Sequence, residues 1–397
     1  MTQSKPSADD GVIAPTLQFR GSPEPTLGIE VELQVIDPTT RNLIQAVPQI
    51  LAAIEDDRHY KPELIRSNLE INTDVCRTIR EARENLCTLM QQLLTVCDRL
   101  GYAIACAGTH PFAHWKDQAI TENPRYLALV ERHGWVCRRL AIFGIHYHIG
   151  VPNGEQAIAI LNALMAYIPH LLALSASSPF WIGRDTGLQS TRSKIFESLN
   201  TAGLPYPPVN WNEFVWFVRT LIAAGSIETF REIWWDIRPH PLYGTVEIRV
   251  CDSIPRVSDI IAMAAFVQTL VVDLGRRYDA GEQLTYLPRW IVQENKWRAA
   301  RFGMDARLIC DRNAAQVYVR DAMAQLLDTL LPTARQIGAD IAWPHLYARL
   351  DRPTAADEMR DWYRDSGDLR TVVDRLVQVL RDDLHEAARQ VQRNGVS

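Results

Sequence analysis

The sequence lacks most of the short motifs that identify nucleotide-binding and metal-dependent proteins. It contains no G-x-x-x-x-G-K-[ST], no Gly-Lys dipeptide and no G-x-G-x-x-G. These absences exclude a P-loop and the usual dinucleotide fingerprint. The nearest match to H-E-x-x-H is HEAAR at 385–389, where Arg replaces the second His. We interpret it as a chance match on an amphipathic C-terminal helix.

Cysteine pairs with metal-binding or redox spacing are also absent. The seven cysteines form no C-x-x-C, and their number is odd, so we expect reduced thiols, most of them buried. The N-terminal stretch MTQSKPSADDGVIAP has no apolar core, which argues against a secretory signal. We therefore expect a cytoplasmic protein whose residues 1–16 form a disordered tail.

Charge and composition give no sign of a nucleic-acid partner. The net charge is −5, the pI is about 6.1, and the basic residues are scattered rather than arranged in a stripe. The chain has 397 residues, 47% hydrophobic and 22% charged, which is typical of a globular protein with a large core. No linker or low-complexity tract interrupts it, so we expect a single domain over 17–397. The sequence does not decide between a monomer and a homodimer.

One apolar segment, AIAILNALMAYIPHLLALSA at 157–176, is long enough to cross a membrane. It contains Asn162, Pro169 and His170, and it lacks a basic flank. We interpret it as a buried core helix, and we expect no membrane partner.

Hydrophobic periodicity predicts long helices separated by short strands. Helices are expected at 78–100, 155–176, 212–224, 257–275, 286–302, 313–336 and 369–391, and strands at 27–36, 64–72, 103–107, 143–152 and 244–252. Strands and helices do not alternate in a βαβ rhythm. The expected fold class is therefore α+β, with a largely antiparallel sheet that has helices on one face and polar residues on the other.

Four of these strands place an unusual set of polar residues on one face. Side chains alternate across a strand, so residues two apart point the same way. The residues that share a face are Glu30 with Glu32, His146 with His148, Glu247 with Arg249, and, less clearly, Arg66 with Asn68, Glu70 and Asn72. For any one strand, the alternative is a face that is simply solvated.

Together these residues are typical of a site for a divalent cation and a phosphoryl group. Carboxylates suit Mg²⁺ or Mn²⁺, imidazole suits a softer ion or a nucleotide, and an arginine beside them suits a phosphoryl group. Zinc is less favoured because the Cys and His spacings are missing. Glu30 and Glu32 would repel each other on one face. A cation between them would cancel that repulsion.

Several long segments, in the same order, resemble the glutamate–cysteine ligase type 2 family of bacterial carboxylate–amine ligases. They are LGIEVELQVID, ELIRSNLEINTDVC, AGTHPFAHW, GIHYHIGVP, LLALSASSPFWIGRDTG, TAGLP, WWDIRPHPLYGTVEIRVCD and ENKWRAARFGMDA. The resemblance extends from about residue 24 to the 390s. It implies a glutamine-synthetase-like fold, in which nucleotide and metals lie in an open polar funnel over a curved sheet.

The resemblance also implies ATP-dependent γ-glutamyl transfer. ATP would phosphorylate the γ-carboxylate of glutamate, and an amine, nominally that of cysteine, would attack the acyl phosphate. The implied cofactors are ATP and Mg²⁺ or Mn²⁺. The implied metal ligands are Glu30, Glu32, Glu70, Glu247 and His146, the implied nucleotide-binding residues are His146, His148 and Arg249, and the implied catalytic residues are Glu247 and Arg249.

Other residues leave two interpretations open. Arg184 and Arg192 would bind a substrate carboxylate as guanidinium forks do, or else form salt bridges within loops. Arg238 and His240, in the RPHP segment, are interpreted as structural because prolines make the turn rigid. Three alternative functions stay open: a ligase for another amine acceptor, a nucleotide-binding protein without catalysis, and a metal-dependent hydrolase.

Overall fold

The structure is a computed structural model of the chain, and it describes residues 17–54 and 58–394. The disordered tail expected over residues 1–16 lies outside the described residues. The strands are β1 (Leu27–Ile36), β2 (Tyr60–Pro62), β3 (Asn68–Asn72), β4 (Ala103–Ala105), β5 (Gly144–Gly150), β6 (Phe180–Trp181), β7 (Arg184–Asp185), β8 (Ile237–His240), β9 (Thr245–Asp252), β10 (Arg307–Ile309) and β11 (Gln316–Tyr318).

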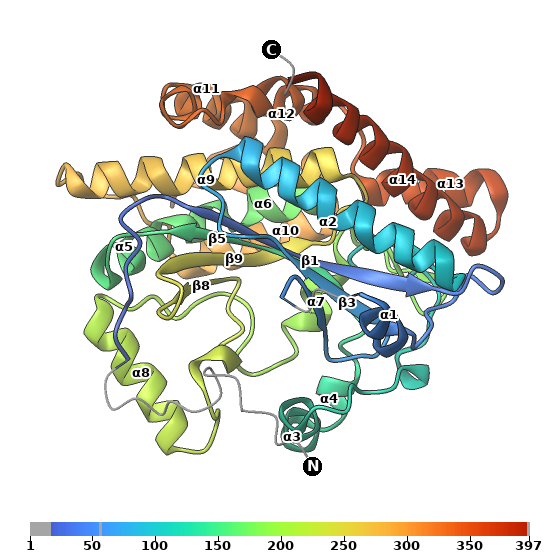
Figure 1. Cartoon of the computed structure of the whole chain (residues 1–397). Helices are drawn as coiled ribbons and strands as arrows, with labels where there is room; N and C mark the ends of the chain where they lie inside the picture. The colour runs from blue at the N-terminus through green and yellow to red at the C-terminus, as the bar shows by residue number, and fades with distance from the viewer. Residues whose placement is uncertain (1–16, 55–57, 395–397) are drawn as a thin grey trace.

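The helices lie around the strands in Figure 1. They are α1 (Val47–Ala53), α2 (Ile79–Leu100), α3 (Pro124–His133), α4 (Trp135–Arg138), α5 (Gly154–Leu164), α6 (Ile168–Ser175), α7 (Thr191–Phe196), α8 (Trp211–Ala223), α9 (Val257–Asp279), α10 (Arg289–Phe302), α11 (Val319–Ile337), α12 (Trp343–Leu350), α13 (Ala355–Ser366) and α14 (Leu369–Asn394).

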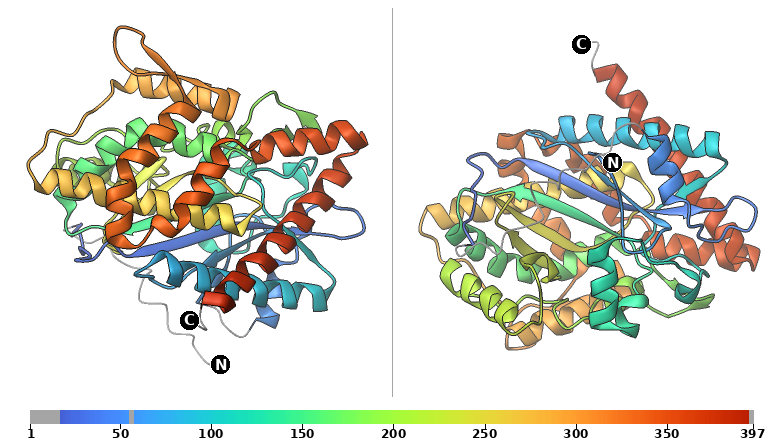
Figure 2. Two further views of the ribbon diagram at one scale, coloured as in Figure 1. Left: turned by 90° about the horizontal axis from the view of Figure 1, so that it is seen from above. Right: turned by 60° about the horizontal axis from the view of Figure 1, so that its bottom comes forward.

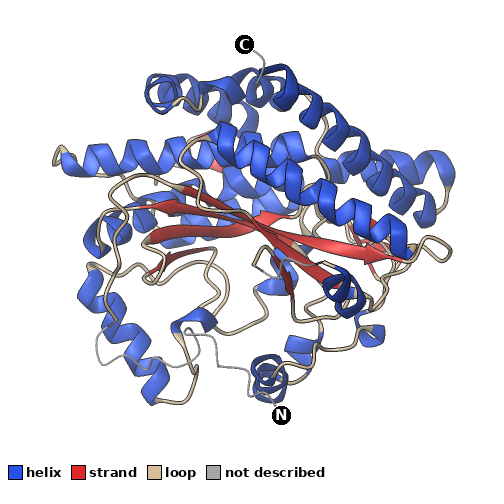
Figure 3. Ribbon diagram, in the orientation of Figure 1, coloured by secondary structure: helices blue, strands red, loops and turns tan. Residues whose placement is uncertain are grey.

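A seven-stranded sheet crosses the centre of the molecule, as the red strands of Figure 3 show. Its strands follow the order β2-β3-β1-β5-β9-β8, and β4 pairs with the end of β1. Every pairing between these strands is antiparallel. The prediction of an α+β fold with a largely antiparallel sheet is therefore confirmed.

Helices cover one face of this sheet and bury its apolar side chains. Ile29, Val31 and Leu33 of β1 point to this face and are fully buried. Burying each such side chain contributes roughly 1.5–3 kcal/mol relative to exposure. Figures 1 and 2 show α2 and α9 over the sheet, with α11 and α14 packed outside them. The apolar core therefore fixes the position of the strands by packing against this face of the sheet.

Two helical stretches have the length and composition of membrane spans, Gly154–Ser175 and Val257–Asp279. In the most apolar 18-residue part of each stretch, 72% and 83% are buried in the structure, which favours core helices. The single helix predicted over 155–176 is instead two helices. α5 ends at Leu164, and α6 begins at Ile168 with Pro169 in its first turn. Proline fits the first turn of a helix, whereas inside a helix it removes a hydrogen bond and clashes with the preceding turn.

The short elements differ most from the predicted ones. The strand expected over 64–72 begins only at Asn68, and the helix expected from 313 is preceded by β11 and begins at Val319. Strand β8 was not predicted, because it contains Pro239. Proline removes a hydrogen-bond donor, and an edge strand such as β8 tolerates that loss.

The opposite face of the sheet lies toward α3, α4 and α7, as Figure 1 and the right view of Figure 2 show. The polar residues of the strands point to this side, and they line a cavity. The sheet therefore separates an apolar core from a polar site.

Candidate active site

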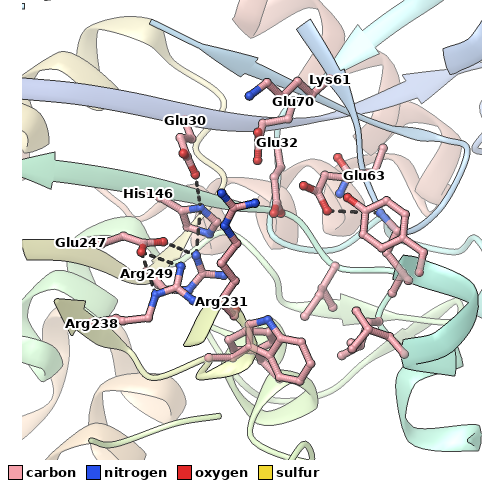
Figure 4. A pocket seen from close by; sticks show the side chains of 18 of the residues that line it. Glu30, Glu32, Lys61, Glu63, Glu70, His146, Arg231, Arg238, Glu247 and Arg249 are labelled. Atoms are coloured by element: carbon pink, nitrogen blue, oxygen red, sulfur yellow. Dashed lines mark hydrogen bonds and ion pairs between the residues drawn. The ribbon is translucent and has the colours of Figure 1, made fainter. Parts of the chain in front are cut away.

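A cavity of about 280 Å³ lies over the polar face of the sheet. From the β2 edge to the β8 edge, the polar side chains that the sheet and the residue after β2 contribute to it are Lys61, Glu63, Asn68, Glu70, Glu30, Glu32, His146, His148, Glu247, Arg249, Arg238 and His240. Figure 4 shows several of them pointing toward one another. The cavity thus brings together residues from strands that are far apart in the sequence.

Strand register decides which of these residues are neighbours. Glu32 lies opposite Glu70, Glu30 lies opposite His146, and His148 lies opposite Glu247. Side chains directly opposite each other on neighbouring strands come within contact distance. The alternation along each strand sets the face, and the register then sets the partners.

Glu30 is held by two histidines. Its carboxylate oxygens lie 2.8 Å from Nδ1 of His146 and 3.2 Å from Nε2 of His148. Burial alone would raise the pKa of Glu30, but the two histidines hold it well below its usual value. Burial and the charge of Arg249 lower the pKa of His146 to about 4. His146 is therefore neutral near pH 7, and it donates its Nδ1 proton to an ionised Glu30.

In contrast to Glu30, Glu32 and Glu70 have raised pKa values. Burial and the charge of Glu63 raise the pKa of Glu32 to about 7, while burial and the charge of Glu30 raise the pKa of Glu70 well above its usual value. One oxygen of Glu32 accepts the Gly144 amide proton at 2.5 Å. The pair faces the cavity as two carboxyl groups that cannot both ionise easily without a cation nearby.

Two groups of side chains have the geometry of a metal site among the described residues. One is Glu30, His146 and Glu247, and the other is Glu32, Glu70 and His146; in each, one ligand atom per residue lies within 4.8 Å of the others. Glu30 and Glu32 fall in different groups, joined by His146. The structure thus does not pair these two acids with each other, as the sequence suggested, but with different neighbours.

Glu247 is buried between two arginines. Its Oε2 accepts hydrogen bonds from Nε and Nη2 of Arg238, at 2.9 and 2.7 Å, and it also forms an ion pair with Arg249. Burial alone would raise the pKa of Glu247, but the two guanidinium groups hold it well below its usual value. Arg249 therefore has a structural role as an ion-pair partner of Glu247.

Arg249 nevertheless keeps a donor for another group. Its Nε is buried and has no hydrogen-bond partner among the described residues. By contrast, Arg238 also donates to the carbonyl oxygens of Arg231 and Ile233, at 2.7 and 3.1 Å. Arg238 therefore holds Glu247 in place, whereas Arg249 pairs with Glu247 and keeps one buried donor, Nε, without a partner among the described residues.

The two candidate substrate arginines lie in different places. Arg192 of α7 is buried, lines the cavity, and donates to the carbonyl oxygens of Arg249 and Val250, both at 3.3 Å. It packs so closely on Gly144 that a Cβ added there would come within 2.1 Å of its Nη2. Arg184 of β7 is exposed and is not among the residues that line the cavity. Only Arg192 is placed to contact a ligand there.

Several residues that line the cavity were not singled out from the sequence. Arg238 and His240 were interpreted as structural, and the others lie outside the helices and strands that periodicity predicted. These others are Lys61, Glu63, Arg125, Tyr126 and Arg231. The one available signal was the first residue of ELIRSNLEIN, Glu63, which lies at the start of a segment that already carries Glu70.

Solved structures with a similar fold are ligases. The 2.0 Å crystal structure of glutamate–cysteine ligase from Francisella tularensis, in complex with AMP, has a TM-score of 0.68 with 16% identity over 95% of each chain. A bifunctional glutathione synthetase from Pasteurella multocida has a TM-score of 0.64 with 14% identity, over 92% of this chain and 53% of that one. At these identities the similarity establishes the fold.

Sequence comparison places the chain within that class. The family model described as glutamate-cysteine ligase family 2 matches residues 26–375. A protein of Frankia casuarinae named "Putative glutamate--cysteine ligase 2-1" is 44% identical over 369 residues, 91% of this chain and 97% of that one. One of Gloeobacter violaceus, "Putative glutamate--cysteine ligase 2", is 41% identical over 90% of this chain and 97% of that one.

The fold and the relatives together define an enzyme of the carboxylate–amine ligase kind. The chain belongs to glutamate–cysteine ligase family 2. The resemblance identified from the sequence motifs is thereby confirmed.

Proposed function

We propose that the enzyme joins the γ-carboxylate of glutamate to a primary amine, with ATP as the source of energy. Glutamate is first phosphorylated to γ-glutamyl phosphate, and the amine then displaces phosphate, so that the products are a γ-glutamyl amide, ADP and phosphate. Cysteine is the nominal acceptor. One observation supports the proposal most strongly: in a chain of this family, a single cavity places buried carboxylates beside the guanidinium group of Arg249. That group pairs with Glu247 but keeps its Nε without a partner among the described residues.

The carboxylates of the cavity fit a divalent cation of the Mg²⁺ or Mn²⁺ type. Glu32 and Glu70 face each other on neighbouring strands, and burial together with nearby carboxylates raises the pKa of both, so a positive ion would favour their ionised forms. These two residues, with His146 and Glu30 beside them, would hold the ion. When bound, the ion would neutralise negative charge on the phosphates of ATP.

Arg249 is proposed to stabilise the phosphoryl group during its transfer. Its Nε lies buried beside the carboxylates and lacks a partner among the described residues, so a phosphate oxygen could complete its hydrogen bonding. A preorganised donor in a buried site costs no rearrangement when charge develops, which makes it most effective in the transition state. The ion pair with Glu247 would fix the guanidinium plane in advance.

Trapping of the acyl phosphate tests this function directly. Hydroxylamine is a small, neutral nucleophile near pH 7, and it attacks acyl phosphates without help from the enzyme. With Mg²⁺-ATP, glutamate and hydroxylamine, the enzyme should form γ-glutamyl hydroxamate and an equal amount of phosphate. Phosphate without hydroxamate would indicate a hydrolase, and neither product would indicate nucleotide binding without catalysis.

A further inference from the structure

Glu63 is a cavity carboxylate at the edge of the sheet opposite the arginines. It directly follows β2, the first strand of the sheet order, whereas Arg238 lies on β8, the last one. Figure 4 shows Glu63 and Arg249 on opposite sides of Glu32. Neither of the two metal-type groups among the described residues includes Glu63. The cation and phosphate chemistry proposed above therefore leaves this carboxylate unused.

The surroundings of Glu63 suit a positively charged group. Its Oε2 accepts the Leu64 amide proton at 3.2 Å, and the Tyr126 hydroxyl lies beside it. Burial raises the pKa of Glu63, although the nearby charge of Arg125 opposes that effect. A partly buried carboxylate with raised proton affinity binds an ammonium ion well and can accept a proton from it.

Lys61 and Arg125 line the cavity near Glu63, and part of the wall at this end is apolar. The apolar part is formed by Leu129, Leu140, Ile142 and Trp234. Leu129 belongs to an apolar cluster of α3 and α4 that is separate from the main core, and Leu140 and Trp234 pack against this cluster. This end of the cavity therefore differs from the end at β8 and β9, which is lined by histidine, glutamate and arginine.

We infer that Glu63 and this apolar wall form the acceptor site, and that the acceptor is a primary amine with an apolar body. The inference rests on the proposed function. The Glu63 carboxylate binds the ammonium group and takes one proton from it. The freed nitrogen lone pair then attacks the acyl carbon of γ-glutamyl phosphate, the C–N bond forms, and the C–O bond to phosphate breaks. Phosphate leaves with the electron pair of the C–O bond, and it takes up the second amine proton as the tetrahedral intermediate collapses.

The apolar wall also bears on the size of the acceptor. Cysteine presents only a small thiol, so it would leave most of the surface of Leu140 and Trp234 without contact. An amine with an aromatic or branched body would cover that surface. Each methylene placed in an apolar pocket favours a substrate by about 10-fold or more in kcat/KM.

The first experiment separates activation of glutamate from transfer to the amine. In Glu63→Gln, formation of γ-glutamyl hydroxamate should stay within 3-fold of wild type, because hydroxylamine is already neutral. Transfer to a protonated primary amine should fall by about 10²–10⁴, the usual contribution of a general base. Glu131→Gln, an exposed change on α3, is the matched control and should leave both reactions unchanged.

The two hypotheses fail in different ways in this experiment. If the wild-type enzyme forms no hydroxamate, the proposed function is wrong. If it forms hydroxamate and Glu63→Gln lowers both reactions equally, or lowers neither, the function stands and the acceptor site is not at Glu63.

The second experiment tests the apolar wall with 2-phenylethylamine, ethylamine and cysteine as acceptors. Wild type should prefer phenylethylamine to both others in kcat/KM. Leu140→Asn should reduce the preference for phenylethylamine over ethylamine at least 10-fold, with hydroxamate formation unchanged as proof of folding. Leu127→Asn, an exposed change on α3, is the control. Preference for cysteine, or a raised KM for ATP in place of the changed preference, would overturn the inference.

Discussion

Arg249 forms an ion pair with Glu247, two residues earlier on the same strand. The pairing of β5 with β9 is irregular here: Tyr147 lies opposite Ile248, but Ile145 lies opposite Cys251. Two residues of β9, Arg249 and Val250, therefore oppose the single residue His146. Such a β-bulge bends the strand and redirects a side chain. The bulge places Arg249 within 3.5 Å of Nδ1 of His146 and beside the carboxylates.

Replacing Arg249 tests whether it acts on the phosphoryl group. Arg249→Lys keeps the charge but loses the planar fork, so kcat should fall about 10²–10³, nearly as far as in Arg249→Ala, with little change in ATP binding. Steady-state kinetics and an ATP titration measure the two effects. Wild-type turnover in Arg249→Lys would reduce Arg249 to an ion-pair partner of Glu247.

Replacing Glu247 should damage stability as well as activity. Glu247 is 1% exposed, and Glu247→Gln leaves the guanidinium groups of Arg238 and Arg249 without their buried countercharge. Losing one partner of such a group costs about 3–5 kcal/mol of unfolding free energy. Denaturant unfolding without metal measures it. A loss below about 1 kcal/mol would show that the arginines do not depend on Glu247.

Replacing Glu32 should stabilise the metal-free protein above neutral pH. Burial and the charge of Glu63 raise its pKa to about 7 in the folded state. A carboxyl group whose folded pKa is raised binds more protons when folded, so stability falls as pH rises from about 4.5 to 7. In EDTA, Glu32→Gln should gain about 3 kcal/mol over wild type at pH 8 and less than about 1 kcal/mol at pH 5. An equal difference at both pH values would contradict this.

Replacing Glu70 should raise the metal requirement of the reaction. Glu70 lies opposite Glu32 and belongs to the same metal-type group. Glu70→Gln should need at least 10-fold more Mg²⁺ for half-maximal activity, because one anionic ligand is lost. The measurement is a Mg²⁺ titration of ADP formation at saturating ATP. An unchanged Mg²⁺ dependence would place the cation elsewhere in the cavity.

Alternation along strands was enough to predict the polar face of the sheet. Glu30, Glu32, His146 and Glu247 point into one cavity because the side-chain period of a strand is two, whatever its partners are. The α+β class followed from the spacing of apolar residues. These features depend on local geometry, so a single sequence carries them.

The same reasoning could not predict the register between strands or the shortest elements. The pairing of Glu32 with Glu70 depends on how two distant strands slide against each other. Arg238 was interpreted as structural because Pro239 follows it, and only the position of β8 at the sheet edge explains that proline. Glu63 follows a strand of three residues, which is too short to give a periodic signal.

The nucleotide product distinguishes an acyl phosphate from an acyl-adenylate intermediate. With Mg²⁺-ATP, glutamate and a primary amine, we predict one ADP and one phosphate for each γ-glutamyl amide formed, because the terminal phosphoryl group activates the carboxylate. Separation of the nucleotides by ion-exchange chromatography, alongside quantification of the amide, gives this ratio. AMP and pyrophosphate in equal amounts with the amide would contradict the proposed function, because they would mean an acyl-adenylate in place of an acyl phosphate.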